Sequence, residues 1–210
     1  MRNKSIYATY SDQHVTVYQA FGNKIADELL LYGKFGSYFS LSRVSWIKTS
    51  FLWMMHRSEW ASKRDQERIF SIQITKEGFD YILSQAVLTK FRPKIHSTSN
   101  EWKQKLNETN VLCQMDPDRD LYGNELQRKA VQLGLKNEIL IKYVNEFIVG
   151  FSEITDKAKN YKRMILNNNL DISLLPLETK YSINDAVAME LGLSKGDDGQ
   201  CIQESLSENN

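Results

Sequence analysis

Residues 43–60 read RVSWIKTSFLWMMHRSEW, and this stretch decides the fold that we expect. Side chains alternate over its first six residues, so that Trp46 and Lys48 would share one face of a β-strand. Ser50, like the threonine before it, can cap a helix, and the chain from there to about Ala61 is apolar almost all round for two turns. We therefore predict a strand that leads directly into a centrally buried helix.

Other periodic stretches extend this unit in both directions. β-Branched and aromatic residues predict a strand at 14–21, and an amphipathic helix follows from Asn23 to Gly33. Residues 68–75, RIFSIQIT, alternate strictly and predict a strand, with a helix from residue 76 to about residue 89. Later in the chain we expect a short helix from Ser99 or Asn100. Strands are expected at 111–115 and 130–133, with turns at 116–119 and 123–124 between them. A helix from 137 to about 147, a strand at 148–154 and a short helix from Ser182 to Gly192 complete the expected elements.

This order of elements predicts an α+β fold. We expect a single domain over residues 1–193, with a mixed or antiparallel sheet and packed helices. A chain of 210 residues that is 41% hydrophobic and 25% charged is typical of one folded domain. Residues 194–210 are rich in Gly, Asp, Ser, Glu and Asn, and we expect them to be a disordered tail.

Composition excludes several classes of function. Lys and Arg number 27 against 26 Asp and Glu, so the whole-molecule charge of +1 gives no general attraction to nucleic acid or membranes. The two cysteines and three histidines lack metal-ligand spacing, so we expect no metal. The longest apolar run, residues 51–55, is far shorter than a bilayer span, and no signal peptide is visible, so we expect a cytoplasmic protein without a membrane partner. A glycine-rich phosphate loop is also missing.

The segment quoted first carries an aromatic and basic pattern. Trp53, His56, Arg57 and Trp60 would share one helix face at spacings of three and four. Aromatic rings beside guanidinium groups suit a stacked base and a phosphate. The alternative is that the tryptophans belong to the core and the cations to a solvated rim. The candidate binding residues from this segment are Arg43, Trp46, Ser50, Trp53, His56 and Arg57.

Lys48 is the sharpest single candidate. A half-buried lysine needs an anionic partner or a function. It could hold a phosphate near the N-terminus of the following helix, whose dipole favours anions, or it could act as a nucleophile. The structural alternative is a salt bridge to Glu67 or Asp116.

Polar residues beside the other predicted strands complete the candidates. Each of them also has an ordinary interpretation, as a strand residue, a turn former or a helix end. Paired carboxylates in such turns could act as acid and base. These candidates are Tyr18 and Gln19 at the end of the first strand, Gln66 and Glu67 before the strand at 68–75, Asp116 and Arg119 in the predicted turn, and Glu146 at the mouth of an apolar run.

Several short motifs together resemble the domain-of-unknown-function family 4291. They are Val17-Tyr18-Gln19-Ala20, the segment from Trp46 to Ala61, Gln66-Glu67-Arg68, Ile74-Thr75 with Gly78-Phe79, Asp116-Pro117, Gln132-x-Gly134-Leu135 and Leu175-Pro176-x-Glu178-x-x-Tyr181. The resemblance covers residues 6–193 and adds Gln132 to the candidate binding residues. This chain has Thr49 where a proline is usual and Met115 where a tryptophan is common.

The order of the early elements also resembles ADP-ribosyltransferase folds. In those folds a polar residue of the first strand holds the nicotinamide ribose, and a glutamate of a late strand positions the acceptor. The resemblance implies that Tyr18 or Gln19 and Glu146 take these roles here. It also implies NAD as the cofactor.

We therefore expect a nucleotide-using transferase of ADP-ribosyltransferase type that acts on nucleic acid or protein, with Lys48, Glu146 and Tyr18 as catalytic candidates. Two alternatives stay open. One is a nucleotidyltransferase, such as an RNA ligase, that uses ATP to adenylylate Lys48. The other is a non-catalytic RNA or nucleotide binding module built on the aromatic and basic face. The expected partners are a nucleotide and RNA, and NAD and ATP are the candidate cofactors of the two enzymatic alternatives.

Overall fold

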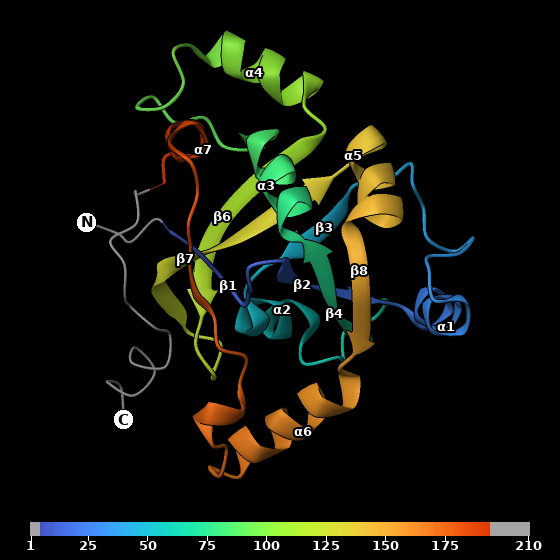
Figure 1. Cartoon of the computed structure of the whole chain (residues 1–210). Coiled ribbons are helices and arrows are strands. Elements are labelled where there is room, and N and C mark those ends of the chain that lie inside the picture. Colours follow the sequence, from blue (N-terminus) through green and yellow to red (C-terminus); the bar gives the residue numbers. More distant parts are fainter. Residues whose placement is uncertain (1–4, 194–210) are drawn as a thin grey trace.

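A computed structural model describes residues 5–193 and places a seven-stranded sheet at the centre of the protein (Figure 1). The strands are β1 (Ile6–Ala8), β2 (His14–Phe21), β3 (Ser45–Lys48), β4 (Arg68–Thr75), β5 (Ala86–Leu88), β6 (Val111–Arg119), β7 (Glu125–Leu135), β8 (Ile148–Glu153) and β9 (Thr179–Tyr181). The large sheet has the order β5-β6-β7-β3-β2-β4-β8, while β1 and β9 form a separate pair. Only β5 and β6 run parallel within the large sheet. The predicted α+β single domain with a mixed sheet is confirmed.

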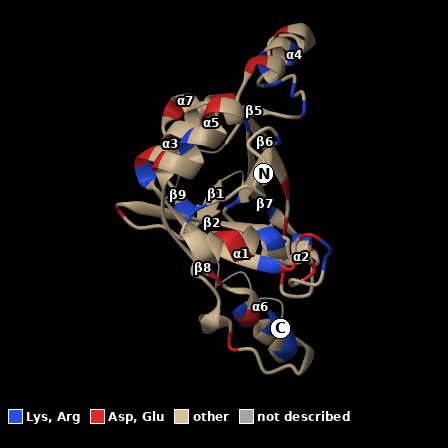
Figure 2. Ribbon diagram, turned by 90° about the vertical axis from the view of Figure 1, so that its right-hand side faces the viewer, with Lys and Arg blue, Asp and Glu red and all other residues tan. Residues whose placement is uncertain are grey.

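Helices cover both faces of the sheet. They are α1 (Asn23–Tyr32), α2 (Phe51–Ser58), α3 (Lys76–Ser84), α4 (Ser99–Glu108), α5 (Asn137–Lys142), α6 (Thr155–Leu166) and α7 (Asp185–Leu191), with a π-helical turn at Tyr143–Phe147 and a 3₁₀ turn at Ile172–Leu174. The larger apolar core packs α1, α3, α5 and α7 against one face, and a smaller core packs α2 and α6 against the other. In Figure 2, α3, α5 and α7 gather at the upper left, α2 lies at the right and α6 at the bottom. Across residues 5–193, every helix falls short of the length and apolarity that crossing a bilayer requires.

The predicted strand–helix unit is confirmed. β3 ends at Lys48, and α2 begins at Phe51 after Ser50, whose Oγ accepts a hydrogen bond from the backbone N–H of Trp53 at 3.2 Å. The first five residues of α2 are all buried, as their unbroken apolar character predicts. The strands expected at 14–21 and 68–75 are also found with those bounds.

Several predicted elements were wrong in extent; α2 ends at Ser58 and not near Ala61, and β7 is longer than the strand expected at 130–133. The helix expected to reach about residue 89 ends at Ser84, because the next three residues pair in parallel with β6 as β5. The turn expected at 116–119 lies inside β6, where Pro117 pairs with Lys129 and the register shifts before Arg119. A bulge tolerates proline because the ladder does not need its missing N–H there. The helix expected from 137 to 147 changes to a π-helical turn at Tyr143.

Other elements had no assignment from the sequence. The three-residue strands β1 and β9 pair with each other although they lie far apart in the sequence. Helix α6, which follows β8, was also not expected. Short strands of this kind have too few residues to show a period, and only their distant partner makes them strands. The tail expected at 194–210 lies outside the described residues.

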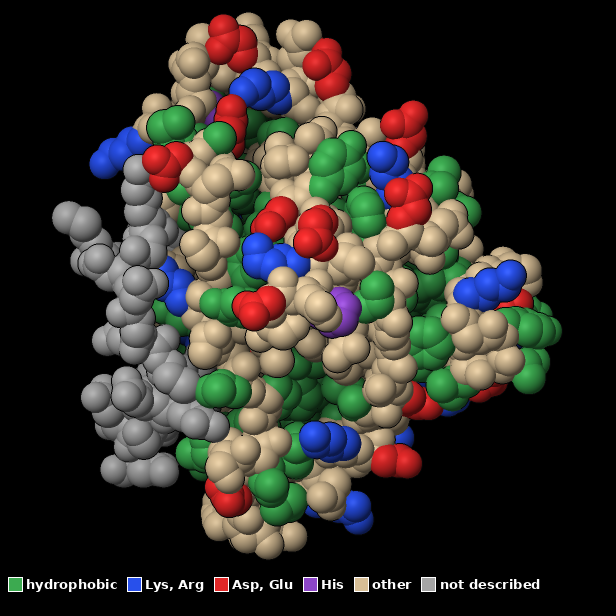
Figure 3. All heavy atoms as spheres, in the orientation of Figure 1, with side chains coloured by type: hydrophobic (Ala, Val, Ile, Leu, Met, Phe, Trp, Pro, Cys, Tyr) green, Lys and Arg blue, Asp and Glu red, His purple; other side chains and the backbone are tan. Residues whose placement is uncertain are grey.

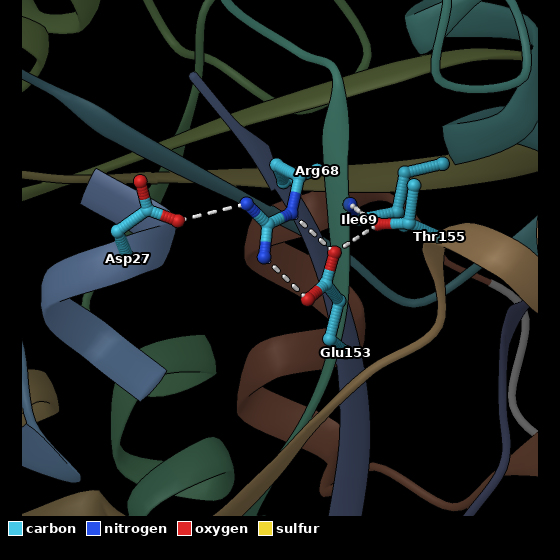
Figure 4. A network of polar contacts seen from close by, with 5 residues as sticks. All are labelled: Asp27, Arg68, Ile69, Glu153 and Thr155. Carbon is cyan, nitrogen blue, oxygen red and sulfur yellow. Dashed lines mark hydrogen bonds and ion pairs between the residues drawn. The ribbon is translucent and has the colours of Figure 1, made fainter. Parts of the chain in front are cut away.

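Arg68 at the start of β4 ties four elements together (Figure 4). Its guanidinium donates to both carboxylate oxygens of Glu153 in β8, with 2.7 Å between Nη2 and Oε2, and to Asp27 of α1 at 2.9 Å. The Thr155 hydroxyl of α6 donates to Glu153 at 2.6 Å and accepts the backbone N–H of Ile69 at 2.9 Å. Bonding to Arg68, and then to Thr155, holds the pKa of Glu153 below its usual value.

Replacing Arg68 tests this network. Arg68→Met should lower the free energy of unfolding at pH 7 by about 2–3 kcal/mol, because it leaves a half-buried carboxylate without its bidentate partner. The folded-state pKa of Glu153 is lowered, so its contribution is present at neutral pH and is lost as the pH falls below about 4. Urea denaturation at both pH values measures the difference between variant and wild type.

The matched control is Lys105→Met, which removes the exposed ion pair between Lys105 and Glu190. It should cost less than about 0.5 kcal/mol, because exposed ion pairs contribute little. Equal losses in the two variants would contradict the role of Arg68.

Candidate functional site

The central sheet opens between β2 and β3. These strands share one register position, Tyr18 opposite Lys48, although β2 pairs with β4 along all eight of its residues. Beyond that position the Gln19 side chain fills the gap: its Nε2 donates to Ser45 Oγ at 2.9 Å and to the carbonyl oxygen of Trp46 at 3.3 Å. A cavity of about 1210 Å³ lies here, which we call the Lys48 cavity.

A row of polar side chains crosses the sheet at this region. Tyr18, Lys48, Gln132 and Gln114 lie in register across β2, β3, β7 and β6, on the sheet face that α2 covers, and the last three of them line the cavity. Asp116 is two residues beyond Gln114 on the same face, and its Oδ2 accepts a hydrogen bond from Gln132 Nε2 at 2.5 Å. The strand register therefore assembles residues that are far apart in the sequence.

Most of the predicted site residues meet at this opening. Nine of the fifteen line the Lys48 cavity: Gln19, Arg43, Trp46, Lys48, Trp53, Arg57, Gln66, Asp116 and Gln132. Two more, His56 and Arg119, line a second cavity of about 710 Å³ that also contains Trp60, and we call it the Trp60 cavity. The two cavities share Trp53, Arg57 and Asp116.

The other four predicted residues lie elsewhere. Tyr18 is buried in the smaller core, with its ring edge-on to Phe51, and burial raises the pKa of its hydroxyl. Glu67 accepts the backbone N–H of Asp65 at 2.9 Å. Glu146 is exposed in the π-helical turn before β8, which lies two strands from β2 in the sheet. The structure therefore does not bring Glu146 to either cavity.

The fourth residue, Ser50, belongs to a buried polar cluster at the N-terminus of α2. Glu178 Oε1 accepts the backbone N–H of Phe51 at 2.6 Å, and Ser50 Oγ donates to Asp118 Oδ1 at 2.7 Å. Arg128 bridges Asp118 at 2.6 Å and Glu178 at 3.6 Å. Burial raises the pKa of Glu178 to about 8 although Arg128 lies beside it. The chain's own carboxylates thus occupy this helix end, which corrects the expectation that a phosphate binds there.

Lys48 has no carboxylate partner. Within residues 5–193 its Nζ donates a hydrogen bond to the carbonyl oxygen of Trp46 at 3.1 Å, and the expected alternative of an ion pair with Glu67 or Asp116 is not formed. The side chain is 8% exposed, and burial, together with the nearby Arg57 guanidinium, lowers the pKa of Lys48 to about 7. Near neutral pH much of this amine is therefore uncharged and nucleophilic.

The lining of the Lys48 cavity favours an anionic ligand. Besides Lys48, three cationic side chains face two carboxylates; they are Lys24, Arg43 and Arg57 against Asp65 and Asp116. Elsewhere the charges of both signs are interspersed, as on the face in Figure 3. The local excess of positive charge, and not the net charge of +1, would therefore select the ligand.

An aromatic wall accompanies these charges. The Trp46 indole lies against Gly134 of β7, where an added Cβ would come within 3.0 Å of two ring atoms. Glycine is therefore needed for the indole to lie in this wall. Trp53 of α2 contributes a second ring, and its buried Nε1–H has no hydrogen-bond partner among the described residues. An acceptor group on a ligand could satisfy that donor.

Several functional candidates escaped the sequence reasoning. Gln114 could have been found, because it has the same strand parity as Asp116. Asp118, Arg128 and Glu178 could not be grouped, because β6, β7 and the segment before β9 supply one each. Among residues 5–193, no group of three His, Cys, Asp or Glu side chains is placed to hold a metal ion.

The sequence matches the family described as "Domain of unknown function (DUF4291)" over residues 5–181. This range includes every residue of both cavities. No curated protein matches the sequence.

Lys48→Met tests whether the buried lysine serves structure or chemistry. It should raise the free energy of unfolding near pH 6.5 by a few kcal/mol, at about 1.4 kcal/mol for each unit by which burial lowers the pKa. The unfolded state binds the extra proton between about pH 7 and the ordinary lysine value of 10.5, so wild-type stability rises with pH and the variant's advantage shrinks.

Urea denaturation at pH 6.5, 8 and 9.5 measures this trend. Lys103→Met serves as the control, because Lys103 is exposed on α4 and its replacement should leave the pH dependence unchanged. A Lys48→Met protein that is less stable than wild type would indicate a structural lysine instead.

Proposed function

This chain belongs to the DUF4291 family, and from the geometry of its Lys48 cavity we propose that it is a nucleotide-using transferase that carries a nucleotidyl group on Lys48. One observation supports this most: a buried amine, without a carboxylate partner among residues 5–193 and with its pKa lowered to about 7, lines a cavity with excess positive charge. Lysines desolvated in this way are suited to nucleophilic attack. A purely structural lysine would be expected to have a carboxylate partner.

The proposed transfer has two steps. The neutral Lys48 amine attacks the α-phosphorus of a nucleoside triphosphate, a P–N bond forms, the P–O bond to pyrophosphate breaks, and the amine loses one proton. An acceptor oxygen then attacks the same phosphorus, a P–O bond forms, the P–N bond breaks, and Lys48 regains a proton. NAD is an equivalent donor, because attack at its adenylyl phosphorus gives the same adduct and releases nicotinamide mononucleotide.

The surrounding residues have matching roles in this proposal. Arg57 and Arg43 would neutralise the phosphate oxygens, whose negative charge is held most strongly by guanidinium groups. Trp46 would pack against the base. Arg57 has a second role, because its charge helps to keep the Lys48 amine neutral before the nucleotide binds.

The expected ADP-ribosyl transfer finds less support in the geometry. Gln19 lines the cavity, but its amide nitrogen bonds Ser45 and Trp46 and its oxygen accepts from the Tyr143 hydroxyl at 2.8 Å. Its polar groups are therefore committed within the protein. Glu146 lies outside both cavities. ADP-ribosyl transfer from NAD would also leave Lys48 unmodified, so the two reactions can be distinguished by mass.

We expect purified protein incubated with ATP, GTP or NAD and Mg²⁺ to gain the mass of one nucleoside monophosphate, with the yield rising as the pH passes through about 7. Intact-mass spectrometry at neutral pH detects the adduct, because acid hydrolyses a P–N bond. Peptide mapping should place it on Lys48.

Two variants separate reaction from binding. Lys48→Ala should lose the adduct. Lys48→Arg should also lose it while still being stabilised by the nucleotide in a thermal-shift assay, because arginine keeps the charge but stays protonated. Wild-type protein that remains unmodified with all three nucleotides, or an adduct that persists in Lys48→Ala, would refute the proposal. Nucleotide binding without any adduct would instead favour a binding module.

A further inference from the structure

We infer that the Trp60 cavity binds the acceptor of this transfer, and that the acceptor is the end of a single-stranded nucleic acid. The role of the bound molecule as acceptor rests on the proposed function, whereas the contacts that would bind it do not. The cavity lies between α2, the loop that follows it, the β6–β7 turn and α6.

The Trp60 cavity is contiguous with the Lys48 cavity. Trp53, Arg57 and Asp116 line both cavities, so a group bound in one lies beside a group bound in the other. Transfer from Lys48 to an acceptor needs this adjacency, because the acceptor oxygen must reach the same phosphorus.

Two residues that line the Trp60 cavity have a buried N–H donor without a hydrogen-bond partner among the described residues. Trp53 is 7% exposed, and neither its Nε1–H nor the Nε–H of Arg119 has a hydrogen-bond partner among the described residues. The terminal nitrogens of Arg119 are already engaged, by the carbonyl oxygen of Gly123 at 3.2 Å and by Glu125 at 3.2 Å. Unpaired buried donors are rare in folded proteins, and phosphate or sugar oxygens are acceptors that would satisfy them.

The backbone at Trp60 is strained. Glu59, Trp60 and Ala61 have φ angles of 52°, 57° and 66°, the left-handed region that side chains other than glycine rarely adopt. The backbone N–H of Trp60 bonds the carbonyl oxygen of Met55 at 2.8 Å and fixes this conformation. Three consecutive strained residues point to a functional reason for the position of the ring.

Aromatic rings and cationic side chains lie together at the Trp60 cavity. Trp60 has the Lys162 ammonium of α6 at 5.7 Å from its ring, and Tyr122 on the β6–β7 turn is 66% exposed. Unpaired bases stack on such rings, while lysines neutralise the backbone phosphates. Lys63 lines the same cavity.

The carboxylates that line the cavity equal its cations in number, four of each, so its attraction for phosphate depends on where Lys63 and Lys162 lie and not on a net charge. Glu125 pairs with Arg119, and Asp120 accepts the backbone N–H groups of Tyr122 at 2.9 Å and Asn124 at 2.8 Å. Glu59 and Asp116 are the other two acidic residues of the lining. Besides Lys162, which lines the cavity, α6 carries Lys157, Lys159 and Arg163, three further basic residues that would meet a nucleic-acid strand leaving the site (Figure 2).

Fluorescence anisotropy with labelled single-stranded RNA and DNA of about ten nucleotides tests the site in the absence of any nucleoside triphosphate. Lys63→Glu/Lys162→Glu should raise the Kd about tenfold or more at about 0.1 M salt and flatten the salt dependence, because two phosphate contacts are lost. Tyr122→Ala should raise the Kd several-fold through lost stacking.

The matched control is Lys94→Glu/Lys103→Glu, which makes the same change of charge at exposed positions outside both cavities and should leave the Kd within about twofold. Melting temperatures confirm that each variant is folded.

The outcomes separate this inference from the proposed function. Wild-type protein that forms the Lys48 adduct but binds no oligonucleotide, or binds it equally in both double variants, would overturn the inference alone. Oligonucleotide binding that depends on Lys63 and Lys162 without any adduct would support the nucleic-acid site and remove the proposed transfer. Transfer of the nucleotidyl group to a protein and not to the oligonucleotide would also overturn the inference.

Discussion

The carbonyl oxygen of Trp46 accepts hydrogen bonds from two side chains, Gln19 of β2 and Lys48 of β3. A backbone carbonyl inside a protein must be bonded, and in a continuous ladder the neighbouring strand would supply the donor. Here side chains do so, and β2 and β3 can separate after one shared position without leaving that carbonyl unpaired. The sheet can therefore open here, with Lys48 at the wall of the cavity, while the Trp46 carbonyl oxygen stays hydrogen-bonded.

The protein keeps its buried charges in two unlike places. At the N-terminus of α2, Asp118 and Glu178 share Arg128, and Glu178 also accepts the backbone N–H of Phe51, so these buried groups have one another and the helix end as partners. On the neighbouring strand Lys48 is buried without an anion. A folded protein stabilises the first arrangement by itself, whereas the second becomes favourable when a ligand brings negative charge. This contrast is why the cavity, and not the helix terminus, is the better candidate for binding a nucleotide.

Features that depend on neighbours in the chain could be predicted from the sequence. The alternation at 68–75 predicted β4 and the apolar run after Ser50 predicted α2, because the buried face of a strand or helix is determined by the pattern of consecutive residues. The meeting of Lys48 with Gln132 and Asp116 could not be derived in this way, because it depends on the register between β3, β7 and β6. Glu146 was wrongly grouped with Gln19 for the same reason: its place in the sheet order is invisible locally. Pro117 misled the prediction because a proline-containing turn motif and a bulged strand look alike in sequence.

The pairing of β1 with β9 joins residue 6 to residue 181, and Glu178, just before β9, bonds the first residue of α2. A chain emerging from the ribosome therefore has every cavity-lining residue before it has the carboxylate that holds α2 in place. Domains whose decisive contacts join distant parts of the chain close slowly, since the connecting loop must be ordered first. Completion of the site thus requires the chain to be made at least as far as β9, and a chain that stops before Glu178 would lack a contact that holds α2 beside the Lys48 cavity.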